Sequence, residues 1–215
     1  MPRIVPVSDT HSYHRKVEVP DGDIFVHSGD ITFRGEMAIL EDFCKWMKEL
    51  PHKHKLVVFG NHDNFTHYNK FAIAKKLIED AGATLLHNSE TTIDGLKFYG
   101  SPHTPTFYDW YWMIDRGKRM AENWRAIPDD VNVLITHGPP HRILDEAPRG
   151  LGQFDNVGCE DLLARIKELK KLRLHIFGHI HNSFGTAEKD GVIFVNAATC
   201  TEKYQPTNKP IVIYL

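Results

Sequence analysis

Five short groups of potential metal ligands occur along this 215-residue chain, and each lies just past an apolar run. The runs end at Val7, Val26, Phe59, Ile135 and Phe177. The groups are Asp9-Thr10-His11, Gly29-Asp30, Gly60-Asn61-His62-Asp63, Thr136-His137-Gly138 and Gly178-His179-Ile180-His181. Buried strands that end in this way aim carboxylates and imidazoles at one rim of a sheet, where open α/β folds place their chemistry. The pattern predicts two metal ions and a hydrolytic reaction.

Strands and helices alternate at first, and hairpins follow in the middle and at the end. Apolar periodicity predicts helices over residues 37–50, 69–80, 116–125 and 158–170. It predicts strands over 4–7, 24–26, 56–59, 84–86, 91–93, 96–99, 131–135, 174–177, 183–187, 192–195 and 211–214. Asp94-Gly95 and Asp190-Gly191 are typical of hairpin turns, whereas residues 139–157 are expected to form a long loop. This order predicts an α/β fold, a four-layer α-β-β-α sandwich of two mixed sheets flanked by helices.

Composition limits the partners and the compartment. With no linker or change of composition, we expect residues 1–215 to form one domain. A formal charge of -2 argues against strong binding of duplex nucleic acid but leaves nucleotides open. Three separated cysteines without a CxxC motif, no signal-peptide pattern and no long apolar run suggest a protein of the reducing cytoplasm with no membrane partner.

The ligand types also limit the metal. His179 and His181 are two residues apart, so in an extended segment their side chains share one face. Nitrogen and oxygen ligands without thiolate suit manganese, iron, zinc or cobalt and disfavour copper(I) and iron–sulfur clusters. A neutral ligand such as Asn61 keeps the site positive, as an anionic phosphate requires.

The five groups together resemble the sequence blocks of the calcineurin-like metallophosphoesterase family. That family's blocks are D-x-H, G-D, G-N-H-[DE], H and G-H-x-H, in the order found here between Asp9 and His181. Within the family the chain is similar to the small metallophosphoesterase-domain-containing, class III phosphodiesterase-like branch. The segments Tyr99-Gly100-Ser101-Pro102 and Val157-Gly158-Cys159 add to that similarity.

The resemblance implies two sets of metal ligands that share Asp30. One set is Asp9, His11, Asp30 and His181, and the other is Asp30, Asn61, His137 and His179. Some members of the branch lack the histidine that matches His179, but this chain retains it. Two divalent transition-metal ions are therefore expected, with manganese favoured and iron, zinc, cobalt or nickel as alternatives.

The resemblance also implies a phosphodiesterase that hydrolyses small phosphodiesters such as cyclic nucleotides. A hydroxide between the metals would attack phosphorus, and His62 would be the general acid. Asp63 could orient His62, and Arg34 has the chemistry of a phosphate clamp, although it could equally be a solvated loop arginine. His103 and His141 are candidate substrate-binding residues.

Two questions stay open at the level of sequence. The aromatic residues between Phe107 and Trp112 could stack on bases or fill a gap between sheets. The same metal core would also serve a phosphomonoesterase or a nuclease. A weakly active binding or scaffold protein that retains one metal is a further alternative, which the intact ligand set disfavours.

Overall fold

Two large mixed sheets form the centre of the computed structural model, which describes residues 1–215 apart from the side chain of Tyr68. The first sheet has the order β15 (Ile213–Tyr214), β1 (Arg3–Val7), β2 (Ile24–His27), β3 (His54–Val57) and β4 (Thr84–Leu85). The second has the order β13 (Gly185–Lys189), β14 (Val192–Asn196), β12 (Leu174–Phe177), β9 (Val133–Thr136), β6 (Leu96–Ser101) and β5 (Ser89–Ile93). In each sheet the inner strands are parallel, and antiparallel strands occupy edge positions.

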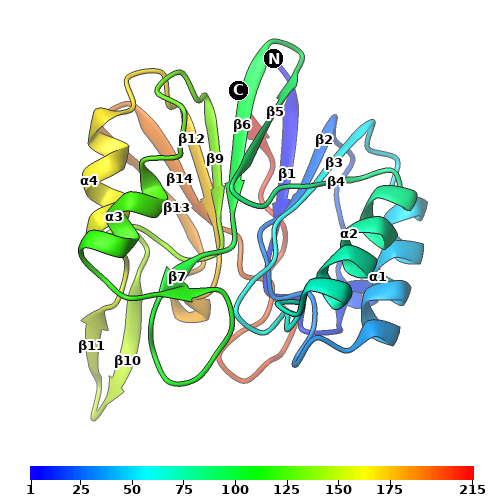
Figure 1. The fold of residues 1–215 in the computed structure, drawn as a ribbon, viewed down its shortest axis with the longest axis horizontal. Helices are drawn as coiled ribbons and strands as arrows, with labels where there is room; N and C mark the ends of the chain where they lie inside the picture. Colours follow the sequence, from blue (N-terminus) through cyan, green and yellow to red (C-terminus); the bar gives the residue numbers. More distant parts are fainter.

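Two pairs of helices cover the outer faces of the sheets (Figure 1). The helices α1 (Met37–Glu49) and α2 (Tyr68–Asp80) lie on the first sheet. The helices α3 (Lys118–Trp124) and α4 (Glu160–Glu168) lie on the second. Two short 3-10 turns, η1 (His14–Lys16) and η2 (His181–Ser183), complete the helical elements. The predicted four-layer α-β-β-α arrangement is confirmed.

Alternation along the strands divides the core into layers. Ile24 and Val26 of β2 pack in the cluster between the two sheets, with residues of the second sheet such as Val133. Phe25, between them in sequence, faces the other way and packs in the cluster that contains Phe43 of α1. Successive residues of a strand point to opposite faces, and both faces of these strands are buried. The result is a continuous apolar run, which is why the sequence shows no alternation at these strands.

The prediction of a long loop over residues 139–157 is wrong in part. The segment contains a hairpin of β10 (Glu146–Gly150) and β11 (Gln153–Asn156), which extends from the lower end of the molecule in Figure 1. Its strands are mostly exposed, so main-chain pairing forms the hairpin without an apolar face that the sequence could reveal. A second small sheet pairs β7 (Thr104–Pro105) with β8 (Met113–Ile114).

Among the described helices, none combines the length and the apolar composition that a membrane-spanning helix requires.

The three cysteines are free and buried, and we expect them to be chemically silent in the folded protein. Burial raises the pKa of Cys44 and of Cys200 to about 12. At about pH 8 only about one thiol in 10⁴ with such a pKa is the reactive thiolate. Ellman's reagent should therefore label almost no thiol of the native protein, and three per chain after denaturation. Rapid labelling of a native cysteine would contradict this burial.

Candidate metal centre and active site

All five ligand groups meet where the carboxyl ends of the parallel strands of both sheets come together. Asp9 follows β1, Asp30 follows β2 and Asn61 follows β3, while His137 follows β9 and His179 follows β12. The two rims are joined at their ends, since Ser8 pairs with Ala198 as an isolated bridge. The main-chain N–H of His179 also donates to the Asp9 carboxylate at 2.9 Å. The junction of two sheets thus converts five separate strand ends into one site.

Three groups of side chains at this junction could each hold a metal ion. They are Asp9, His11 and His181; His11, Asp30 and His62; and Asp30, His137 and His179. Within each group the ligand atoms lie within 4.8 Å of one another. Asp30 and His11 each belong to two groups, so the three are contiguous.

The hydrogen bonds of the histidine rings show that the site suits a cation. Nδ1 of His11 lies 3.3 Å from the Thr32 carbonyl oxygen, and Nδ1 of His181 lies 3.0 Å from that of Thr201. A carbonyl only accepts, so each Nδ1 carries hydrogen and, in the neutral ring, each Nε2 presents a lone pair. These two Nε2 atoms face each other at 3.3 Å. Two lone pairs in this arrangement require a shared proton or a cation between them.

The second half of the site repeats this arrangement. Nδ1 of His137 lies 3.0 Å from the carbonyl oxygen of Ser28, which directs its Nε2 toward the site. That Nε2 lies 2.9 Å from Oδ1 of Asn61 and 3.3 Å from Oδ1 of Asp30. Nε2 of His137 and the oxygens of Asn61 and Asp30 thus converge on one point. The residues present therefore fit divalent metal ions with nitrogen and oxygen ligands.

Electrostatics sets the protonation of these groups before any cation binds. Burial raises the pKa of Asp30, but the charge and hydrogen bond of His137, together with the charges of His62 and His11, hold that pKa well below its usual range. For His137 burial has the opposite effect and on its own would lower the pKa. The charge and hydrogen bond of Asp30 instead raise the pKa of His137 to about 9. Burial lowers the pKa of His11 to about 4 and that of His179 to about 3. The Asp30 carboxylate and the neutral rings of His11 and His179 are thus already in the form that binds metal, whereas His137 would have to release a proton to a cation.

Backbone conformation brings the ligands together at a cost in strain. Asp9 (φ 53°), His11 (φ 40°), Asp30 (φ 56°) and His179 (φ 68°) all lie in the left-handed region. Such residues persist only where surrounding structure holds them, and they are concentrated at functional sites. A Cβ on Gly178 would lie 2.0 Å from Oδ2 of Asp9, so glycine permits this close approach.

His62 lies at the edge of the site with a defined ring orientation. Its main-chain N–H donates to Oδ1 of Asp30 at 2.8 Å, and its Nδ1 lies 2.8 Å from the carbonyl oxygen of Phe33. The group that bonds Nδ1 of His62 is thus Phe33 and not Asp63, the residue that the sequence suggests for this task. The buried Asp63 carboxylate instead accepts from the main-chain N–H groups of Thr32 and Gly60, each at 2.9 Å. It joins the two ligand-bearing loops.

The structure does not bring three of the predicted residues to the wall of the cavity at the site. Arg34 is exposed, and its main-chain N–H donates to Glu36. His103 pairs with the Ser101 hydroxyl at 3.2 Å. His141 lies 3.7 Å from the carboxylate of Asp145, beside α4. The roles predicted for Arg34, His103 and His141 at the substrate are therefore not supported by their positions.

A cavity of about 300 Å³ opens over the metal-ligand groups. Asp30, Asn61, His62, His179 and His181 form its floor. Part of its wall comes from segments that the sequence does not mark as functional, namely Ala147–Pro148 of β10 and Glu202 and Tyr204 after β14.

The aromatic residues between Phe107 and Trp112 lie in two different surroundings. Phe107, Tyr108 and Trp110 line the cavity. Trp112 instead packs beside the core of the first sheet, and its indole N–H donates to the carbonyl oxygen of Asp63 at 2.8 Å. Neighbouring aromatic residues thus divide between the lining of the cavity and the packing of the first sheet.

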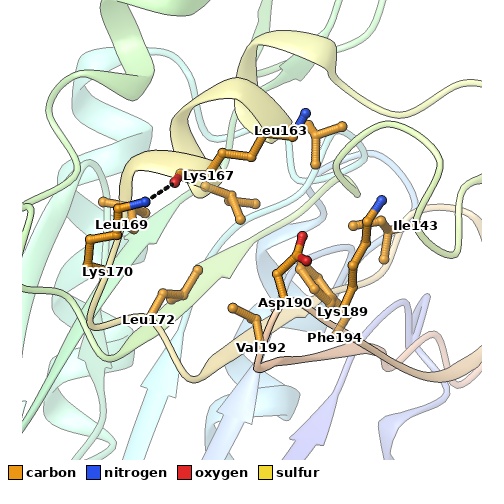
Figure 2. Close-up of a pocket in the computed structure, with 11 residues that line it drawn as sticks. Ile143, Leu163, Lys167, Leu169, Lys170, Leu172, Lys189, Asp190, Val192 and Phe194 are labelled. Atoms are coloured by element: carbon orange, nitrogen blue, oxygen red, sulfur yellow. Dashed lines mark hydrogen bonds between the residues drawn. The ribbon is translucent and has the colours of Figure 1, made fainter.

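A second cavity, of about 290 Å³, lies between α4 and the β13–β14 hairpin (Figure 2). Its lining is mainly aliphatic, with Lys167, Lys189 and Asp190 at the rim. It contains no residue of the three metal-ligand groups found in the described part of the chain. The chemistry therefore belongs to the cavity at the sheet junction.

Comparison with known proteins agrees with the fold and the site. The profile of the calcineurin-like phosphoesterases matches residues 2–183. Metallophosphoesterase domain-containing protein 1 of Homo sapiens is 37% identical over 233 residues, which cover 99% of this chain and 71% of that protein. One solved crystal structure superposes with a TM-score of 0.66 at 17% sequence identity. The superposed residues cover 91% of this chain and 90% of the chain in that structure. Another, of a protein from Thermus thermophilus, covers 91% and 88% at 14% identity, with a TM-score of 0.57.

The double-sheet sandwich with acid–imidazole groups at its junction defines a metal-dependent hydrolase. The chain belongs to the calcineurin-like phosphoesterase family, and it is therefore a phosphoester hydrolase.

Proposed function

We propose that the protein is a dinuclear metal-dependent phosphodiesterase that hydrolyses small phosphodiesters such as cyclic nucleotides. The observation that carries this proposal is the position of Asp30 between the two halves of the site. Its Oδ1 lies 3.3 Å from Nε2 of His137, and its Oδ2 lies 3.7 Å from Nε2 of His11. A carboxylate shared between two ligand sets is suited to bridging two cations.

The ligand sets follow from this geometry. Asp9, His11 and His181 would hold one ion with Asp30, and Asn61, His137 and His179 would hold the other with Asp30. When bound, the ions would activate water and neutralise charge on the phosphoryl oxygens. We favour manganese, with iron, zinc, cobalt or nickel as alternatives.

The remaining steps depend on side chains of this protein. The bond from Nδ1 of His62 to the Phe33 carbonyl directs Nε2 of His62 toward Asp30 at 4.0 Å and toward the cavity. From there a protonated His62 can donate to the departing ester oxygen as general acid. The hydrogen bond between Nδ1 of His62 and the carbonyl oxygen of Phe33 keeps the His62 ring from rotating.

The charge of the cavity favours a diester over a monoester. Among the described residues that line it, none is lysine or arginine. A phosphomonoester is a dianion near neutral pH and usually gains from a guanidinium or ammonium partner. A diester carries one negative charge, which bound metals can balance. The phosphomonoesterase alternative would therefore have to rely on the metals alone.

A reconstitution experiment tests this proposal. Protein stripped with chelator is reloaded with each of the five metals and assayed on bis(p-nitrophenyl) phosphate, p-nitrophenyl phosphate and a single-stranded oligonucleotide. We expect two ions per chain and the highest kcat/KM on the diester. A maximum of one ion would contradict the dinuclear site. Preference for the monoester, or salt-sensitive cleavage of the oligonucleotide, would favour the alternatives.

The variant His62→Ala tests the general acid. Proton donation matters most for a poor leaving group, so the hydrolysis of a cyclic nucleotide, which expels an alkoxide, should fall by about 10²-fold or more. Hydrolysis of bis(p-nitrophenyl) phosphate, which expels a stable phenolate, should fall by less than about tenfold. Steady-state kinetics of both esters measures the difference, with the exposed His67→Ala as the control. Equal losses on both esters would remove His62 from this role.

A further inference from the structure

Two fully buried histidines lie behind the candidate metal ligands, one in each sheet. His27 is the last residue of β2, and His175 lies within β12. The residue before each of them, Val26 or Leu174, packs between the two sheets. Successive strand residues point to opposite faces, so both histidines face the outer layers, toward the helices. Neither belongs to the metal-ligand groups found in the described part of the chain.

Both rings are surrounded by aromatic side chains. The ring centroid of His27 lies 5.0 Å from that of Phe43, and the ring centroid of His175 lies 4.8 Å from that of Phe177. Burial lowers the pKa of each histidine to about 3, so both rings are neutral. An apolar side chain would fill the same space without burying two polar nitrogens. Packing therefore does not account for a histidine at either position, and the hydrogen bonds of the rings must be considered.

The His27 ring joins two ligand-bearing loops. The main-chain N–H of Gly29 donates to Nδ1 of His27 at 3.3 Å, so in the neutral ring the hydrogen is on Nε2. That Nε2 lies 3.1 Å from Oγ1 of Thr10 and donates to it. Thr10 directly follows the ligand Asp9, and Gly29 directly precedes the shared ligand Asp30. One buried ring thus fixes the spacing of two loops that carry metal ligands.

The His175 ring has an equivalent role in the second sheet. The hydroxyl of Thr136 donates its only hydrogen to the carbonyl oxygen of Gly138 at 2.7 Å. Nε2 of His175 lies 2.8 Å from the same hydroxyl oxygen, so Nε2 must be the donor. These two bonds hold the residues on either side of the ligand His137. Nδ1 of His175 has no partner among the described residues, and an unpaired buried nitrogen costs stability. The ring therefore fits a task at His137 better than a task in folding.

We propose that His27 and His175 are positioning residues for the two halves of the dinuclear site. His27 holds the half that contains Asp9, here called the Asp9 half. His175 acts through Thr136 on the half that contains His137, here called the His137 half. This inference rests on the proposed function, because it assumes that two ions bind at these ligands. Residues that hold metal ligands in place typically change metal affinity by about 10- to 100-fold.

Calorimetric titration of chelator-stripped protein with Mn²⁺ measures the two binding steps. The reference variants His181→Ala and His179→Ala each remove one ligand, the first from the Asp9 half and the second from the His137 half. They show which step belongs to which half. We expect His27→Leu to weaken the step of the Asp9 half by about tenfold or more, and His175→Leu to weaken the step of the His137 half by the same amount. Each variant should act at least about threefold less on the other step.

Two further variants separate positioning from a general loss of structure. The amide nitrogen of glutamine can take the place of Nε2, so His175→Gln should restore the affinity to within about threefold. Thr136→Val removes the hydroxyl that receives the bond. Adding His175→Leu to it should weaken binding no further, because both changes remove the same interaction. The melting temperature of the His175→Leu apoprotein should not fall, because this change also removes an unpaired buried nitrogen.

His52→Leu is the matched control. His52 is also buried, at 2% exposure, but it precedes β3 at the amino end of that strand, whereas the ligands follow the carboxyl ends. This variant should leave both binding steps within about twofold. If His27→Leu and His175→Leu bound two ions as tightly as the unmodified protein, the positioning role would be wrong and the proposed function would stand. A loss that His175→Gln does not restore would also overturn the role. An unmodified protein that binds at most one ion would overturn both proposals.

Discussion

The variant Asp30→Asn is expected to lower diester turnover by about 10³-fold and to reduce the bound metal to at most one ion per chain. The amide keeps the size of the side chain and an oxygen that can accept from the N–H of His62, which now bonds Oδ1 at 2.8 Å. It loses the negative charge that two cations would share. Metal ions contribute several kcal/mol to such reactions, and about 1.4 kcal/mol corresponds to a tenfold change in rate. Steady-state kinetics and elemental analysis measure the two effects.

The matched control for this variant is Asp42→Asn. The Asp42 carboxylate lies on α1 and bonds Arg15 and His14, away from the cavity. The same change of charge at Asp42 should leave turnover within about twofold, because a partly exposed ion pair contributes little to stability and this one does not contact the cavity. An Asp30→Asn protein that retained two ions and full activity would remove Asp30 as the shared ligand.

The variant Gly178→Ala is expected to disrupt the site through one methyl group. The added Cβ would lie 2.0 Å from Oδ2 of Asp9 and 2.2 Å from Oγ of Ser8, so the Asp9 carboxylate must move. Displacement of a ligand by about 1 Å costs about 10²-fold in rate. Overpacking of a buried site also costs about 1–3 kcal/mol in the free energy of unfolding. Kinetics and denaturant titration of the apoprotein separate these two effects.

A second glycine provides the control for backbone strain. Gly95, in the turn between β5 and β6, has a φ of 81° and no neighbouring atom within 4 Å of an added Cβ. Gly95→Ala should cost about 1 kcal/mol in unfolding free energy, because alanine resists positive φ, and should leave turnover unchanged. If Gly178→Ala behaved like Gly95→Ala, the packing of Asp9 against β12 would be looser than the structure shows.

Much of the fold could be predicted because its signals are local. The helix over Met37–Glu49 follows the apolar stripe of Leu40, Phe43 and Met47, and the structure buries these residues against the first sheet. The parallel strands are apolar runs because both of their faces are buried. The β10–β11 hairpin escaped prediction because its strands bury almost no apolar surface and depend on main-chain pairing.

The same contrast applies to the site. The residues expected as ligands carry their own chemistry and follow strands, so their convergence could be anticipated. Asp63 also looks like a functional acid in sequence, yet its bonds to main-chain N–H groups give it a structural task. Arg34, His103 and His141 carry suitable chemistry but lie off the cavity wall. A residue type shows what a side chain can do, whereas its direction depends on the backbone around it.

The family, the alternation of elements and the set of candidate ligands could be read from the chain, because each depends on residues that are close together in sequence. Which side chains face one another became known from the folded arrangement alone. His11 and His181 are 170 residues apart, and their Nε2 atoms lie 3.3 Å from each other. Tyr204 likewise lines the cavity beside residues that are distant from it in the sequence, such as Asp30 and Asn61. Contacts of this kind depend on how two sheets pack, and no local pattern of residues encodes that.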